Sequence, residues 1–289
     1  MGKSGVYGLL CAALLTLLVS QAAWAQTNTG NLPQAAASED SAAPPTAFAA
    51  AVCEHPADSA QETADQRIVD EAMSATNSGG YAALATRLPA LRDVLTHAPS
   101  CYPEVERRGD DIVVRSNQSS TAVLALTLVA AAQHQNVRVV RGANPYTYAS
   151  LLLGAYSDEM RHFEEGIAWL DRGLALQPHE ENLVLEKATA LGQLHRVDEQ
   201  IALLQAELSD EFASLSIDKS RYRRNLGVAL IDANRLDEAE AALRESIRLE
   251  PNNPRAENEL RYIAQLRAGG QHAETTMAHI GDAPANPRR

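Results

Sequence analysis

Phe163–Glu181, FEEGIAWLDRGLALQPHEE, and Leu236–Pro254, LDEAEAALRESIRLEPNNP, repeat one pattern of side-chain sizes. Each stretch follows a glycine that lies 24 residues before a proline, Gly154 in the first case and Gly227 in the second. Counted from that glycine, the paired residues match in size: Leu153 with Leu226, Phe163 with Leu236, Gly166 with Ala239, Leu170 with Leu243, and Gly173 with Ser246. Small residues at fixed spacing let two helices cross closely, and large apolar residues fill the space beside them. The pattern therefore predicts a repeated helix pair.

A third copy is expected between these two stretches. The two glycines are 73 residues apart, which is two periods of about 34 residues with five residues left over. Residues 181–214 fit a middle unit in which Ala188 takes the glycine position, and its large positions hold Leu191, Val197 and Leu204. Gln200 and Glu207 replace its small residues, and the extra residues fit within 209–218.

These residues resemble the tetratricopeptide repeat, a helix-turn-helix unit of about 34 residues. The matching motif is Leu-Gly, a large residue, Ala or Gly, a large residue and then Pro. The family's aromatic residue three positions after Leu-Gly is Ser157 and Leu230 here. The resemblance implies a mainly α fold, a right-handed α-solenoid within 146–268. Its units are expected at 147–180, 181–214 and 220–253, and a capping helix at 254–268 with Asn253 as N-cap and Pro254 in its first turn.

The first 25 residues have the features of an export signal. Lys3 precedes an apolar core, and Ala23-Trp24-Ala25 precedes Gln26. The core is shorter than the roughly 20 residues of a membrane span. The signal is expected to direct the chain to the periplasm or beyond, and cleavage is predicted between Ala25 and Gln26. No membrane span is expected after cleavage. A retained N-terminal anchor is the alternative. Residues 26–51 are expected to form a disordered linker, and 269–289 a flexible tail.

Residues 52–145 are predicted to form a helical N-terminal domain that also contains two short strands, Ile112–Arg115 and Val137–Val140. A hairpin at 65–98 is expected to break at 77–80. It could be a degenerate repeat, although Pro89 counts against this. The apolar stretch 121–132 predicts a buried helix, with one continuous helical region as the alternative. Cys53 and Cys101 flank the hairpin, and an even pair of cysteines in an oxidising compartment favours a disulfide.

The resemblance implies that the first helix of each unit lines a concave groove. The residues expected there are Tyr148, Leu151, Leu152, Asn182, Leu185, Arg221, Arg224 and Asn225. We expect a non-enzymatic scaffold that binds a peptide segment of another envelope protein, with an acidic or C-terminal carboxylate end near Arg221 and Arg224. Two alternatives stay open. The arginines could be solvated or paired with Glu186 and nearby acids, and Tyr148, Leu151 and Leu152 could pack on the upstream domain.

Other functional classes find less support in the sequence. A net charge of −12 argues against nucleic acid as a partner. No Gly-x-Ser-x-Gly, phosphate-loop or dinucleotide motif occurs, so no catalytic residue, cofactor or metal is predicted. A competing hypothesis is a thiol-redox or metal-handling protein that uses Cys53, His55 and Cys101, with the repeats as a docking arm. One tetratricopeptide subfamily captures C-terminal carboxylates with a Lys and an Asn where this chain has Leu151 and Ala155, which puts that mode in doubt.

Overall fold

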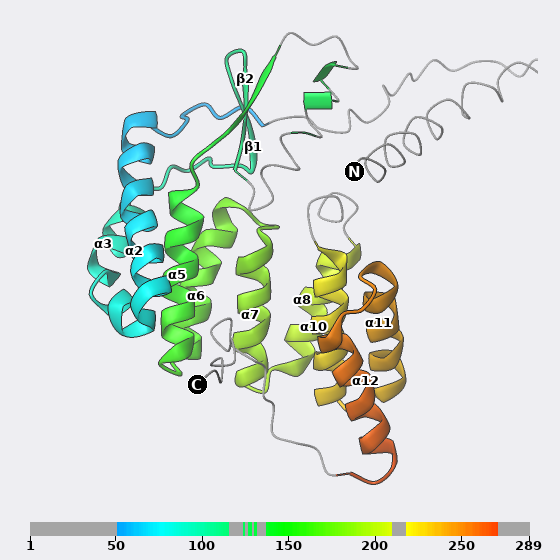
Figure 1. Cartoon of the computed structure of the whole chain (residues 1–289). Helices are drawn as coiled ribbons and strands as arrows, with labels where there is room; N and C mark the ends of the chain where they lie inside the picture. Colours follow the sequence, from blue (N-terminus) through cyan, green and yellow to red (C-terminus); the bar gives the residue numbers. More distant parts are fainter. Residues whose placement is uncertain are drawn as a thin grey trace, which may run out of the picture. The chain divides into compact units, whose positions relative to one another are not determined.

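The computed structural model describes residues 51–115, 137–209 and 218–270, together with Leu124, Thr127, Leu128, Ala130 and Ala131 (Figure 1). The chain divides into two units, 1–48 and 49–289, and all described residues belong to the second. The predicted export signal, its Ala25–Gln26 cleavage site, nearly all of the linker, residues 210–217 and the tail from 271 onward lie outside the described residues.

The N-terminal hairpin consists of α2 (Ser59–Ala85), α3 (Leu88–Val94) and the short 3-10 helix η1 (Leu95–His97). The Asp58 carboxylate caps α2 by accepting hydrogen bonds from the backbone N–H groups of Ala60 and Gln61. The break expected at 77–80 is a kink at Gly80, whose φ of 63° suits glycine. Pro89 lies in the first turn of α3, where a proline costs no hydrogen bond, so it starts a helix.

The three strands of the small sheet are β1 (Val105–Arg108), β2 (Asp111–Val114) and β3 (Arg138–Arg141). β2 lies in the centre, antiparallel to β1 and parallel to β3. β2 and β3 match the two predicted strands to within one residue. β1 was missed because VERR has one β-branched residue and three charged ones. Ala51, the last residue of the predicted linker, forms a bridge with Glu106 in β1.

The described residues of 121–132 contradict the prediction of a helix buried on all sides. Ala130 is buried, but Leu124 and Leu128 are 60% and 62% exposed. Apolar composition alone does not say whether another element covers a segment.

A disulfide joins Cys53 to Cys101, whose Cα atoms are 5.7 Å apart, and confirms the predicted pairing. It connects the segment before α2 to the segment after η1, so it ties together the two ends of the hairpin. With a sequence separation of 48, such a bond stabilises by about 4 kcal/mol in the chain-entropy description.

Seven helices follow in the described C-terminal part, and they confirm the prediction of a mainly α fold built from repeated helix pairs (Figure 1). The three pairs and the final helix are α5 (Pro145–Glu159) with α6 (Phe163–Leu176), α7 (Glu181–Gln193) with α8 (Val197–Ser209), α10 (Lys219–Asp232) with α11 (Leu236–Leu249), and α12 (Pro254–Arg267). Asn253 caps α12 as predicted, because its side chain accepts hydrogen bonds from two backbone N–H groups.

The first helix of each pair ends in the same turn. Arg161, His195 and Asn234 have left-handed φ values of 61°, 57° and 56°. In each turn the next backbone N–H donates to a carbonyl five residues earlier, at 2.8–2.9 Å. This is the Schellman arrangement, which satisfies the last carbonyls of a helix. α12 ends in the same way at Gly269, whose φ is 91°. It therefore has the C-terminal turn of a first helix.

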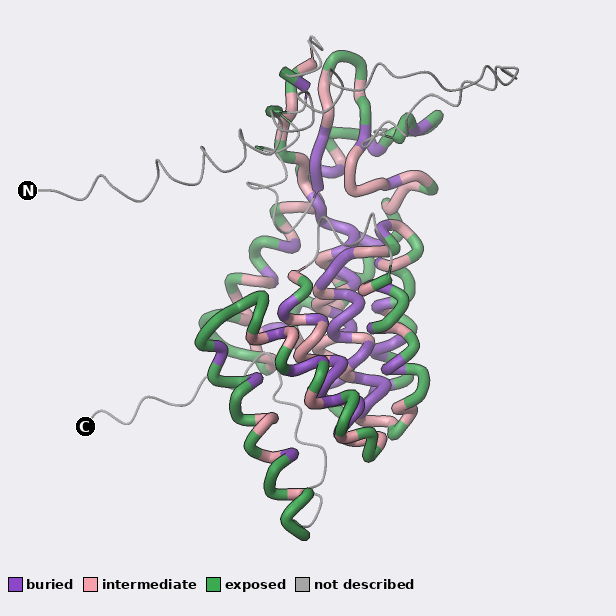
Figure 2. The backbone as a smooth tube through the Cα atoms, turned by 90° about the vertical axis from the view of Figure 1, so that its right-hand side faces the viewer, coloured by how far each residue is buried: buried purple, intermediate pink, exposed green. Residues whose placement is uncertain are grey.

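The helices of a pair cross at the glycines that revealed the repeat. A Cβ atom added at Gly227 would lie 2.6 Å from Leu243 Cγ, and one added at Gly154 would lie 2.7 Å from Leu170. Leu170 and Leu243 are both completely buried. Figure 2 shows buried residues recurring along the packed helices. The sequence repeat is thus a repeat of one packing contact.

Gly227→Ala should lower the free energy of unfolding by about 1–3 kcal/mol, because the new methyl group overlaps Leu243. In a Leu243→Ala background the same change should cost much less, since the space is then free and alanine favours a helix. Urea denaturation of the four proteins in this double-mutant cycle measures the coupling. Additive effects would contradict a close contact between residues 227 and 243.

Candidate functional site

The apolar residues predicted to line a groove are engaged in packing. Tyr148 and Leu152 lie against the core that α2 and α3 form with α5, next to residues such as Val69 and Leu91. Leu185 is buried in the core shared by the second and third helix pairs. Leu151 is half-buried on the same helix as Tyr148. Tyr148 and Leu152 thus match the alternative of packing on the upstream domain.

Arg221 connects α10 to α7. Its guanidinium donates to a Glu181 carboxylate oxygen at 3.0 Å and to the Asn182 side-chain oxygen at 3.5 Å. Glu181 is buried, and burial raises the pKa of its carboxyl, while Arg221 opposes this. Asn225 donates back to the Arg221 carbonyl at 2.9 Å. Arg221 therefore has an acidic partner, as the alternative proposed, although that partner is Glu181 and not Glu186.

Arg224 differs from Arg221 because its guanidinium makes no hydrogen bond or ion pair with any described residue. The side chain is half-buried. Burial lowers the pKa of its guanidinium, and the positive charges of Arg255 and Arg221 lower it further. Glu250 and Asp218 act in the opposite direction, but both have other partners, since Glu250 accepts from Ser220 and Asn253, and Asp218 caps α10. The half-buried Glu259 is a third acid in range; burial and the charge of Asp232 raise its pKa, and the Arg224 charge lowers it. A cation held in this way gains from an added anion.

Arg255, which the sequence reading missed, completes this group of arginines. It lies in the first turn of α12 and is exposed. Arg255 was missed because α12 was interpreted only as a capping helix and not as part of a binding surface. Arg255 lies 34 residues after Arg221, so it occupies the same position one period later. The repeat spacing could have identified it. Arg221, Arg224 and Arg255 are called the arginine cluster below.

Replacing Arg224 should affect stability in the opposite direction from replacing Arg221. Arg224→Met removes a half-buried, unpaired charge and should raise the free energy of unfolding by up to about 1 kcal/mol. Arg221→Met leaves buried Glu181 without its partner and should lower it by about 1–3 kcal/mol. Urea denaturation at neutral pH compares the two variants. A loss of stability in both would show that Arg224 is paired in the folded chain.

Two buried acids lie between the first two helix pairs. Asp158 in α5 is 2% exposed, and neither of its carboxylate oxygens has a hydrogen-bond partner within the described residues. Burial, together with the charge of Glu186, raises the pKa of Asp158 to about 8. Burial raises the pKa of Glu186 in α7 to about 7. At neutral pH the region around Asp158 and Glu186 therefore has less negative charge than two ionised carboxylates would give it.

Asp158 faces Gly166, where an added Cβ would overlap the carboxylate. In the second pair the order is reversed, because Gly192 faces Gln200. The Gln200 side chain is fully buried, and its amide oxygen and nitrogen have no hydrogen-bond partner in the described chain. A glycine on one helix thus accommodates a polar side chain on the other, which explains how Gln200 replaces the small residue expected there.

Asp158 should make the folded chain less stable as the pH rises. Its folded pKa of about 8 exceeds the value of about 3.9 for an unfolded chain. The stabilisation from the bound proton is complete below the unfolded pKa and is lost as the pH rises through the folded pKa. Between pH 5.5 and 8.5 the wild type should therefore lose at least about 1 kcal/mol more than Asp158→Asn. Urea denaturation at both pH values tests this, and parallel losses would contradict it.

A buried ionic cluster attaches the sheet to α2, and sequence reasoning did not find it. The Arg115 side chain is fully buried, and its guanidinium lies 3.1 Å from a Glu62 oxygen and 2.6 Å from a Glu106 oxygen. Arg108 contacts the same two acids at 3.1 and 2.9 Å. The Tyr102 hydroxyl donates to Glu62 at 2.7 Å. Two positive and two negative charges balance here, which makes their burial tolerable.

The residues of the competing redox hypothesis are only partly brought together. Cys53 and Cys101 are bonded to each other, and His55 is exposed. Metal binding requires a cysteine thiolate, and the two sulfur atoms of a disulfide are not thiolates. Within 51–115, 137–209 and 218–270, no three His, Cys, Asp or Glu side chains are placed to hold a metal ion. Among the helices of those ranges, none combines the length and apolar character that crossing a membrane requires.

No protein-family model matches the chain, and no curated protein sequence matches it. Several solved structures are similar. The first TPR domain of Spaghetti (RPAP3), solved with an HSP90 peptide, is 24% identical over 41% of this chain and 93% of its own, with a TM-score of 0.35. The Arabidopsis OM64 TPR domain is 16% identical over 42% and 96%, with a TM-score of 0.37. A MamA mutant is 16% identical over 72% and 90%, with a TM-score of 0.40.

The described helix pairs have the tetratricopeptide arrangement. Their own features carry this assignment, namely the small residues at each crossing and the left-handed turn that recurs within every pair.

Proposed function

We propose that this chain is a non-enzymatic scaffold, exported to the periplasm, that binds a peptide segment with a carboxylate end at the arginine cluster. The observation that carries the proposal is the state of Arg224, which is half-buried beside two further arginines and forms no hydrogen bond or ion pair with a described residue. The charges of Glu250, Asp218 and Glu259 act on it only from a distance. A structural arginine normally has its counter-ion within the fold, as Arg221 does. An arginine without one retains its donors for a ligand.

The chemistry of the cluster selects a carboxylate. A guanidinium presents parallel N–H donors that match the two oxygens of a carboxylate, and a bidentate pair is stronger than a neutral hydrogen bond. The three arginines come from α10 and α12, and two of them, Arg221 and Arg255, are one repeat period apart. A peptide C-terminus or an acidic side chain fits this surface, whereas nucleic acid does not fit the acidic chain as a whole.

Two observations support the periplasmic location within this proposal. The first 25 residues have the pattern of an export signal. The Cys53–Cys101 disulfide is of the kind that persists in oxidising compartments and is rare in the cytosol.

Peptide selection tests the proposed function. A displayed library of random peptides with free C-termini should yield acid-terminated binders, and amidation of a selected peptide should weaken its binding, measured by fluorescence anisotropy. Arg224→Gln should weaken binding at least about tenfold through loss of a charge-assisted pair. The matched control is Arg244→Gln, because Arg244 is exposed on α11 and pairs with Glu240. Selection of neutral peptides, or equal affinity for both variants, would refute the proposed function.

A further inference from the structure

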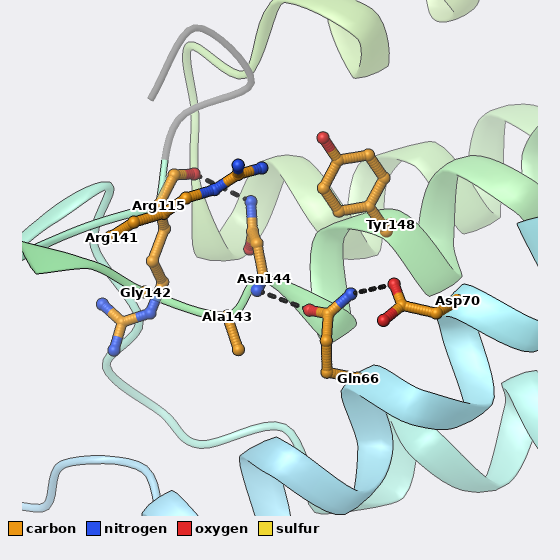
Figure 3. A pocket seen from close by; sticks show the side chains of 8 residues that line it. All are labelled: Gln66, Asp70, Arg115, Arg141, Gly142, Ala143, Asn144 and Tyr148. Atoms are coloured by element: carbon orange, nitrogen blue, oxygen red, sulfur yellow. Dashed lines mark hydrogen bonds between the residues drawn. The ribbon is translucent and has the colours of Figure 1, made fainter. Parts of the chain in front are cut away.

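A second candidate site lies in the N-terminal part of the described chain. A cavity of about 250 Å³ opens between α2, the end of β3 and the beginning of α5 (Figure 3), and is lined by Gln66, Asp70, Arg115, Arg141, Gly142, Ala143, Asn144 and Tyr148. Because a water molecule takes about 30 Å³ of liquid volume, this space corresponds to about eight waters and suits a small molecule with a similar number of non-hydrogen atoms.

Hydrogen bonds hold the inner wall of this cavity in place. The Asn144 backbone N–H donates to Gln66 Oε1 at 2.8 Å, and its side-chain amide donates to the Arg115 carbonyl at 2.9 Å. The Ala143 carbonyl lies 2.8 Å from the Tyr102 hydroxyl, whose one proton it shares with Glu62, and the Gly142 N–H donates to the Val114 carbonyl at 2.8 Å. These bonds engage one backbone group of each of residues 142–144 within the fold, so the wall is preformed.

Two side chains of opposite charge remain for a ligand. Arg141 makes no hydrogen bond or ion pair with the described residues, and Figure 3 shows its guanidinium extended toward Tyr148. Asp70 accepts one hydrogen bond, from Gln66 Nε2 at 2.8 Å to Oδ1. Figure 3 shows Asn144 and Gln66 between Arg141 and Asp70, which do not pair with each other.

Both charges act on the Tyr148 ring that lies beside them. Burial and the charge of Glu180 raise the pKa of the Tyr148 hydroxyl, Arg141 lowers it, and Asp70 raises it again. Glu180, the second acid in range, caps α7 by accepting from the Leu183 N–H at 2.8 Å. Arg141 and Asp70 are therefore the lining charges that we consider as complementary halves of a single site.

We propose that this cavity binds a small zwitterion, whose carboxylate pairs with Arg141, whose ammonium group pairs with Asp70, and whose carbon skeleton lies against Tyr148. A carboxylate matches the guanidinium fork, and an ammonium group suits the carboxylate oxygen that Gln66 leaves open. The site is independent of the arginine cluster, because none of its lining residues comes from α10 or α12.

Isothermal titration calorimetry of the full chain tests this with two sets of probes. Each set pairs a zwitterion with analogues that lack one charge: L-leucine with 4-methylpentanoate and isopentylamine, and 6-aminohexanoate with hexanoate and hexylamine. At least one zwitterion should bind about tenfold more tightly than both of its analogues. Equal affinity within both sets, or no heat from either zwitterion at millimolar concentrations, would overturn the proposal.

Variants at the charged residues locate the binding. Arg141→Gln and Asp70→Asn should each weaken the zwitterion about tenfold. Both residues are exposed, so the fold should tolerate the changes. Arg138→Gln on the same strand is the matched control, because Arg138 pairs with Asp111 outside the cavity. Binding that is unchanged in Arg141→Gln and Asp70→Asn would overturn the proposal, whatever the result for peptides at the arginine cluster.

Discussion

The close crossing of the two helices within each pair is the constraint on which the remaining structure depends. Leu170 fits against Gly154, and Leu243 fits against Gly227, with no room for a methyl group in either place. Close crossings set where the first helix of each pair lies, and hence where its outward residues point. Arg221 and Arg255 are one period apart in the sequence, so they occupy equivalent positions on their helices. The arginine cluster is therefore a product of the repeat, although arginine is no part of the repeat motif.

The local part of this fold could be predicted from the sequence, and the pairing of distant residues could not. Periodic side-chain size revealed the helix pairs, and Asn253 before Pro254 revealed the start of α12. The disulfide followed because two of the three cysteines remain to pair once Cys11, which lies in the predicted export signal, is set aside. By contrast, Arg115 meets Glu62 across 53 positions, and no local pattern encodes such a contact. The candidate site shows the same division, since the repeat placed Arg221 and Arg224 while the pairing of Arg221 with Glu181 depended on packing.

The charged residues of the described chain fall into satisfied and unsatisfied groups, and this division matters more than net charge. Arg115 and Arg108 share two buried acids, and Arg221 has Glu181. Arg224 and Arg141 make no such contact with the described residues. Asp158 and Glu186 reduce the cost of burial by favouring the protonated form. Unpaired charges next to preformed walls are where a helical scaffold can gain specificity without altering its packing.

The turns between the paired helices leave the protein a margin for adaptation. Arg161 and His195 occupy left-handed positions where a side chain costs about 1 kcal/mol or more, whereas Asn234 in the third turn is better suited. Glycine would relieve that cost at both places. Because Arg161 and His195 are not themselves part of these close contacts between helices, such changes would add stability without altering the order of the repeat. A lineage of this protein could therefore accept destabilising changes on its binding face and compensate for them in the turns.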